Sequence, residues 1–186
     1  MSDLLQPARG RLLVATPALS DPNFAGSVVL LLEHDEEGSA GLVLNQPSEL
    51  TLAEAMTAER LALNNTDPPV IFVGGPVQPE SAVVLARARD LSAFDEDRRV
   101  VGDVGVLALS GDPVATLAEA PAFRVFAGYS GWGPGQLADE IEAGSWFVVK
   151  GEADDVFAAE LDSLWERVLR RQGGLLSTAT DNPELN

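Results

Sequence analysis

Two β-type runs separated by a polar turn constrain the fold of this chain more than any other feature. The first run, Ser27 to Glu33, reads Ser-Val-Val-Leu-Leu-Leu-Glu, and the second covers Ala40 to Asn45. Because Asp35 to Ser39 supplies Asp, Glu, Gly and Ser between them, the three segments predict a β-hairpin with an exposed turn. Three consecutive leucines indicate that the first strand is buried on both faces, as in the centre of a sheet.

Predicted strands and helices are interspersed along the rest of the chain, so the fold class is α+β or mixed α/β. Further strands are predicted at 10–16, 70–73, 82–86, near 100, at 104–109, 123–127 and 145–150. Helices are predicted at Thr51–Leu61, Pro113–Ala120, Pro134–Ala143 and Asp155–Arg171. We expect a single domain over residues 1–186, with loosely ordered tails at 1–9 and 173–186.

The charge balance argues against direct binding to nucleic acid. With 12 Lys and Arg against 29 Asp and Glu, the net charge is −17, whereas a phosphate backbone requires clustered cations. The chain contains 0 Cys, which removes disulfides and thiol chemistry. No targeting segment is expected, and the longest uncharged run, Val125 to Ala138, is shorter than the roughly 20 residues of a membrane span. We therefore expect a cytoplasmic protein that does not enter a membrane.

A glycine-rich segment, Gly128 to Gln136, follows a predicted strand and precedes a predicted helix. That context suits a phosphate cradle, but the P-loop Lys is missing and the dinucleotide spacing fails, since Ser130 or Gln136 stands where Gly is needed. Trp132 likewise breaks the pattern of a serine-hydrolase elbow. Three interpretations stay open: a tight structural loop that buries Trp132, a ligand or partner site, and catalysis.

Candidate catalytic side chains are scattered along the sequence. The chain has 1 His, His34, and its neighbours are acidic residues. This composition favours a solvated hairpin tip over a metal site. We therefore predict that the protein binds no metal and no cofactor. An enzyme of the hydrolase type would have to assemble Ser130 with His34, and Asp21 or Glu140, from distant loops.

Several segments, taken together and in order, resemble the YqgE/AlgH family of bacterial proteins. They cover about residues 10–150 and are Gly10 to Pro17, Asp21-Pro22-x-Phe24-x-x-Ser27, Glu33-His34, Gly41 to Pro47, Gly74-Gly-Pro-Val77 and Gly128-Tyr-Ser-Gly-Trp132-x-x-Gly135-Gln136. The resemblance implies an α+β domain whose bifurcated mixed sheet curls into a pseudo-barrel flanked by helices. The family is uncharacterised, and one branch carries a name linked to the regulation of alginate production.

The leading functional interpretation is a non-enzymatic protein that binds an unknown small molecule or protein partner and acts indirectly in regulation. The alternative is a hydrolase-like enzyme built around Ser130 and His34. If a ligand binds, polar and glycine-rich positions that follow apolar strands are the expected lining. These positions are Asn45, Gly74, Gly75, Pro76, Tyr129, Ser130, Trp132 and Gln136.

Overall fold

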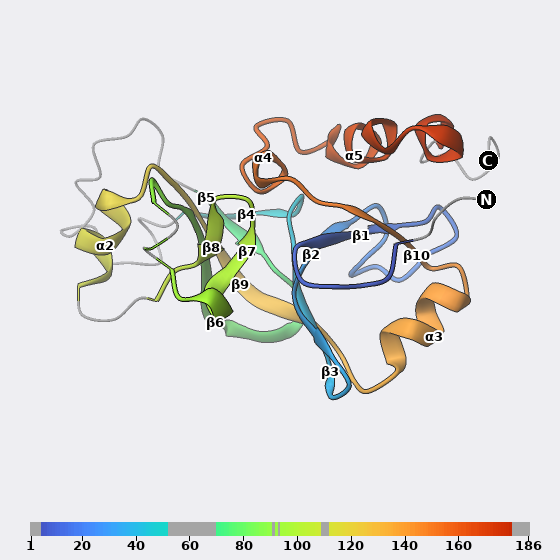
Figure 1. The fold of residues 1–186 in the computed structure, drawn as a ribbon, viewed down its shortest axis with the longest axis horizontal. Helices are drawn as coiled ribbons and strands as arrows, with labels where there is room; N and C mark the ends of the chain where they lie inside the picture. The colour runs from blue at the N-terminus through green and yellow to red at the C-terminus, as the bar shows by residue number, and fades with distance from the viewer. Residues whose placement is uncertain (1–4, 52–69, 91, 93, 109–111, 180–186) are drawn as a thin grey trace.

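The computed structural model describes residues 5–51, 70–90, 92, 94–108 and 112–179. A 10-stranded sheet curls into a half-barrel, with helices packed against it (Figure 1). This arrangement confirms the α+β class. Within the described residues, no helix is long and apolar enough to cross a membrane.

The chain builds this sheet from strands that are distant in sequence. The strands are β1 (Arg11–Ala15), β2 (Val28–Asp35), β3 (Gly38–Val43), β4 (Pro47–Thr51), β5 (Val70–Val73), β6 (Val77–Arg87), β7 (Arg99–Val101), β8 (Val104–Val106), β9 (Ala122–Trp132) and β10 (Trp146–Lys150). The helices are α2 (Pro113–Glu119), α3 (Gln136–Glu142), α4 (Ala153–Val156) and α5 (Leu164–Gln172), with 3-10 turns η3 (Glu96–Arg98) and η4 (Gly174–Thr178).

The sheet branches at β9. Its main path runs β10-β1-β2-β3-β9-β6-β8-β7, while β5 joins β9 off this path and carries β4. The β5–β9 pair is parallel and the other pairs are antiparallel, so the sheet is mixed as well as bifurcated. The architecture implied by the family resemblance is therefore confirmed.

The predicted hairpin is present, and it lies in the middle of the sheet. Strands β2 and β3 pair antiparallel, with Leu30 opposite Leu42. Leu30 packs into the cluster that α5 covers, and Leu31 packs into the cluster on the opposite face that α3 covers. Burial on both faces, which the leucine run predicted, follows from this alternation. The strands run closer to the tip than expected, so that only Glu36 and Glu37 lie between them.

One predicted strand ends too early, and one strand was not predicted. The strand predicted to end at Ala127 continues as β9 to Trp132, so much of the expected glycine-rich loop is strand. Glycine lowers strand propensity in a sequence, but here Ser130, Gly131 and Trp132 pair with β3. The strand predicted over Ala40 to Asn45 does stop before Pro47, because β3 ends at Val43, but Pro47 begins a separate strand, β4, that the sequence did not predict.

The single helix predicted over Asp155–Arg171 is also wrong, because α4 and α5 are separate. Asp155 is 2% exposed, and both of its carboxylate oxygens accept hydrogen bonds of 2.8 Å from Arg171. In one straight helix these residues would stand about 24 Å apart at a rise of about 1.5 Å per residue. The chain therefore has to fold back between them, which the helical spacing of apolar residues could not reveal.

The remaining helix predictions agree with the structure where it can be compared. The helices α2 and α3 lie inside the predicted ranges Pro113–Ala120 and Pro134–Ala143. Of the predicted helix Thr51–Leu61, Thr51 ends β4 and the rest lies outside the described residues.

Candidate functional site

Gly74 stands at the branch of the sheet, where β3, β5 and β9 meet. Its N–H donates to the carbonyl of Ala127 on β9 at 2.9 Å. Its carbonyl accepts the N–H of Val43, the last residue of β3, at 2.9 Å, and the hydroxyl of Ser130 at 3.0 Å. Every polar backbone atom of Gly74 is thereby used in holding three strands together.

The glycines at this branch leave no room for side chains. A Cβ atom at Gly74 would lie 2.3 Å from the carbonyl oxygen of Gly128, and one at Gly75 would lie 2.3 Å from the carbonyl of Tyr129. Gly75 (φ +154°) and Gly128 (φ +68°) also adopt backbone conformations that favour glycine. Backbone packed on backbone is therefore the physical reason for the Gly-Gly pair and for Gly128, the first glycine of Gly-Tyr-Ser-Gly.

Two polar side chains that were predicted to bind a ligand instead form hydrogen bonds with the protein's own backbone. Ser130 is 0% exposed and directs its hydroxyl to Gly74. The Asn45 side chain accepts the N–H of Val28 at 2.9 Å and donates to the carbonyl of Gly26 at 3.0 Å, which fixes the start of β2 beside the end of β3. Both side chains satisfy buried or partly buried backbone groups.

Trp132 anchors α3 to the sheet through a shared carboxylate. The Nε1 atoms of Trp132 and Trp146 donate to one oxygen of Glu140, at 2.9 and 2.8 Å. Gln136 donates to the other oxygen at 2.9 Å and accepts the N–H of Gly133 at 3.0 Å. Trp132 is 5% exposed, so its indole belongs to the core beneath α3.

The side chains proposed for a hydrolase have other partners. The Nδ1 atom of His34 lies 2.7 Å from the hydroxyl of Ser39, while the hydroxyl of Ser130 donates to Gly74. Asp21 accepts the N–H of Asn23 at 2.8 Å. In the part of the chain that the structure describes, no hydrogen bond joins Ser130 to His34. The structure therefore does not assemble this predicted nucleophile and base.

A groove of about 410 Å³ opens beside the hairpin tip, over β2, β3 and β9. Directly opposed residues of a sheet share a face, and the pairs Glu33–Ala40 and Ala40–Gly131 place these three on one face. Ala40 and Gly131 form a low floor because both are small. Tyr129 and Val77 border one side of the groove.

Carboxylates border the groove on the side of the hairpin tip. Glu33, Asp35 and Glu37 are exposed and line it. One oxygen of Asp35 accepts the N–H groups of Glu37 and Gly38, at 2.8 and 3.2 Å. Among the described residues, no group of three or more His, Asp or Glu side chains is arranged to hold a metal ion.

The predicted site residues fall into different places. Gly74, Gly75 and Ser130 form the branch, Asn45 lies at the end of β3, and Gln136 begins α3. Tyr129 and Trp132 border the groove, and Pro76 is exposed next to the branch. Sequence reasoning treated the acidic tip as a solvated turn and missed its place on the groove, although Glu33 and Asp35 alternate as residues on one strand face do.

Comparison with known proteins gives the family. Residues 12–177 match the family described as DUF179, AlgH-like. The chain belongs to the AlgH-like family. A UPF0301 protein of Streptomyces coelicolor is 46% identical over 184 residues, which cover 95% of this chain and 94% of that protein. A UPF0301 protein of Thermobifida fusca is 41% identical over 190 residues, with 95% and 94% covered.

Two solved structures share the fold of this chain. The crystal structure of a Corynebacterium diphtheriae protein superposes with a TM-score of 0.81 at 33% identity, covering 94% of this chain and 92% of that one. The solution structure of the AlgH protein from Pseudomonas aeruginosa gives a TM-score of 0.69 at 30% identity, with 93% and 94% covered. The family resemblance of the sequence is thereby confirmed.

Proposed function

We propose that this AlgH-like chain is a non-catalytic binding protein and that the groove beside the hairpin tip receives a positively charged group of a ligand or protein partner. The observation that carries the proposal is the pairing of an aromatic side, Tyr129, with the carboxylates of Glu33, Asp35 and Glu37. Carboxylates attract a cation, and an aromatic face adds a cation–π contribution of about 0.5–1 kcal/mol at an exposed site.

Gly131 supports a binding role for the groove, in contrast to the glycines of the branch. A Cβ atom there would lie 3.5 Å from Tyr129 Cε2 and 3.6 Å from Val77 Cγ2, which are ordinary contact distances. The fold could therefore accept alanine at this position. The missing side chain instead keeps the floor low, so that a ligand can approach the backbone.

The other predicted site residues take a supporting role in this proposal. The branch residues Gly74, Gly75 and Ser130 hold β9 in place, and Trp132 fixes the end of the same strand to α3. We further propose a cytoplasmic location and an indirect regulatory role. A net charge of −17 favours a cationic partner over DNA, so any effect on transcription would pass through that partner.

A titration followed by NMR tests the groove. Acetyl-arginine amide and acetyl-lysine amide should shift the backbone amide signals of Ala40 and Gly131 in a saturable way, whereas neutral acetyl-glutamine amide should not. Glu33→Gln should raise the dissociation constant for acetyl-arginine amide at least threefold. Glu36→Gln is the matched control, because Glu36 stands at the same tip outside the groove lining.

Two results would count against the proposed groove. Equal shifts with the neutral and charged amides would show that the carboxylates do not select a cation. Equal weakening by Glu33→Gln and Glu36→Gln would show only the general field of an acidic protein.

A further inference from the structure

A hollow of about 430 Å³ lies beside β10, the last strand on the main path of the sheet. Its volume falls within the roughly 300–1,000 Å³ of small-molecule sites. Leu5 packs on the core cluster that α3 covers, and Leu176 packs on the cluster that α5 covers, so the hollow crosses the edge of the sheet from one face to the other. Most of its lining is apolar and consists of Leu5, Val148, Val149, Leu175 and Leu176.

Leu175 is the most exposed part of this lining. It is 81% exposed in η4, whereas Leu50 and Val70, the other exposed large hydrophobic residues of the described chain, are 47% and 38% exposed. Gly173 and Gly174, which precede Leu175, also line the hollow and bring no side chain that could cover it. Because Leu175 continues the apolar walls of the hollow, this surface differs from a single exposed leucine and is typical of a ligand-binding groove.

Lys150 gives the hollow a positive charge. It is the single lysine of the chain, it is exposed, and it forms no ion pair within the described residues. Its N–H donates to Gln172 Oε1 at 3.3 Å and its carbonyl accepts Arg171 Nη2 at 3.1 Å, so its backbone is fixed. Arg11 on β1 is paired directly opposite Lys150. Like charges at opposed positions of a ladder repel each other, and a bound anion would relieve that repulsion.

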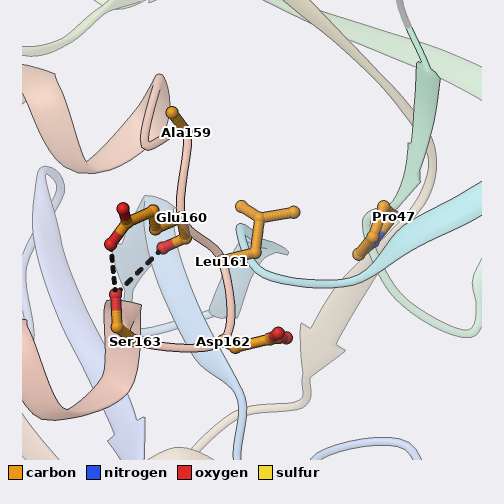
Figure 2. A pocket seen from close by; sticks show the side chains of 6 residues that line it. All are labelled: Pro47, Ala159, Glu160, Leu161, Asp162 and Ser163. Atoms are coloured by element: carbon orange, nitrogen blue, oxygen red, sulfur yellow. Dashed lines mark hydrogen bonds between the residues drawn. The ribbon is translucent and has the colours of Figure 1, made fainter.

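The charge of this lining differs from that of two other hollows of the molecule. Carboxylates border the groove beside the hairpin tip, and Glu160 and Asp162 line the hollow shown in Figure 2. Among the described residues, no carboxylate lines the hollow beside β10. In a chain with a net charge of −17, an apolar hollow whose one charged side chain is Lys150 is complementary to an apolar anion.

Gln172 is the remaining polar side chain of the lining, and the protein itself uses it. Its Oε1 accepts the N–H of Lys150, and its Nε2 donates to the carbonyl of Val168 at 3.1 Å. The lining therefore offers a ligand one ammonium group and apolar contacts. Polar substituents along the body of a ligand would lose their hydration without gaining a side-chain hydrogen bond. A hydrocarbon body with one negative charge fits best.

We propose that the hollow beside β10 binds a fatty acid, with the carboxylate at Lys150 and the hydrocarbon chain along Leu5, Leu175 and Leu176. One carboxylate matches the one ammonium group, and a ligand with more negative charges would be repelled more strongly by the acidic protein. The hollow shares no lining residue with the groove beside the hairpin tip, so this proposal and the proposed function can fail separately.

Four probes separate the charge from the hydrocarbon chain. Octanoate should shift the backbone amide signals of Lys150 and Leu175 in a saturable way and should leave that of Gly131 unchanged. At equal chain length, neutral 1-octanol and cationic octylammonium should bind at least fivefold more weakly. Butanoate should bind at least tenfold more weakly than octanoate, because burial of each CH2 group changes affinity up to about fourfold.

Variants assign the two parts of the ligand to residues. Lys150→Gln should raise the dissociation constant for octanoate at least fivefold and leave that for 1-octanol unchanged, while Lys150→Arg should retain octanoate binding. Arg89→Gln is the matched control, because it removes an exposed positive charge outside the lining. Leu175→Ser should weaken octanoate and 1-octanol alike, with Leu50→Ser as its control. All these side chains are exposed, so the fold should be retained.

Three results would overturn the inference. Equal affinities for octanoate and octylammonium would show that Lys150 does not select an anion. Equal weakening by Lys150→Gln and Arg89→Gln would show only the general field of the protein. Absence of a saturable shift at Leu175 would remove the fatty acid from the hollow. If the protein then bound vesicles of anionic lipid, or formed dimers that Leu175→Ser abolished, a membrane or a second copy would be the occupant instead.

Discussion

The branch of the sheet and the groove beside the hairpin tip are built from neighbouring residues of β9, yet they differ in almost every physical property. Ser130 is buried and bonded to Gly74, whereas the next residue, Gly131, is exposed on the floor of the groove. The branch consists of paired polar groups and backbone contacts too short for a side chain. The groove exposes the carboxylates of Glu33, Asp35 and Glu37 beside the ring of Tyr129. A single Gly-Tyr-Ser-Gly pattern therefore serves packing at some positions and an open surface at others.

Truncating Trp132 should produce the largest effect on the fold. Trp132→Ala removes a side chain that is 5% exposed and breaks the link to Glu140, so we expect a loss of about 3–5 kcal/mol in the free energy of unfolding. Urea denaturation measures it. Trp132→Phe, which keeps an aromatic ring and loses the Nε1 donor, should cost less. A loss below about 1 kcal/mol for the alanine variant would remove Trp132 from the core.

Gly74→Ala should be the next most damaging change. Its Cβ would lie 2.3 Å from the carbonyl oxygen of Gly128, so the branch must open, at a cost of about 1–3 kcal/mol. Gly133→Ala is the matched control, because the nearest atom there is Gln136 Oε1 at 3.9 Å. Equal stability of the two variants in urea denaturation would contradict the close packing at the branch.

Ser130→Ala should cost about 1 kcal/mol, the usual contribution of one hydrogen bond. The loss stays modest because the carbonyl of Gly74 keeps the N–H of Val43 as a donor. Differential scanning calorimetry measures the change. An unchanged melting temperature would mean that the hydroxyl is not needed for the fold and would return Ser130 to the list of functional candidates.

Gly131→Ala should have the smallest effect on stability and the clearest effect on the groove. The added methyl meets Tyr129 and Val77 at ordinary distances, so we expect no loss and a gain of up to about 0.5 kcal/mol. The same methyl raises the floor of the groove and should weaken acetyl-arginine amide in the NMR titration. Normal binding by a stable Gly131→Ala variant would exclude Gly131 from the proposed site.

The sequence predicted elements whose evidence is local. The leucine run of the hairpin was sufficient for β2 and β3, and the prolines that begin the predicted ranges Pro113–Ala120 and Pro134–Ala143 were sufficient for α2 and α3. The spacing of apolar residues and the residue types that favour turns and helix ends act over a few residues. These elements could therefore be predicted from one sequence.

Long-range pairing decided the features that sequence reasoning missed. The break between α4 and α5 depends on Asp155 meeting Arg171, and the full length of β9 depends on its ladder with β3. The groove depends on Glu33, Ala40 and Gly131 falling in register across three strands. The local spacing of apolar and polar residues predicts neither the register between strands nor an ion pair between distant residues.

Amide hydrogen exchange tests most directly whether the branch is scaffold. The N–H of Gly74 donates to Ala127 and that of Val43 donates to Gly74, so both should exchange only with a free energy close to that of global unfolding. The N–H of Glu37 at the hairpin tip, bonded only to the Asp35 side chain, should exchange by local opening. Exchange of Gly74 and Val43 as fast as that of Glu37 would show a mobile branch and would contradict the division between scaffold and groove.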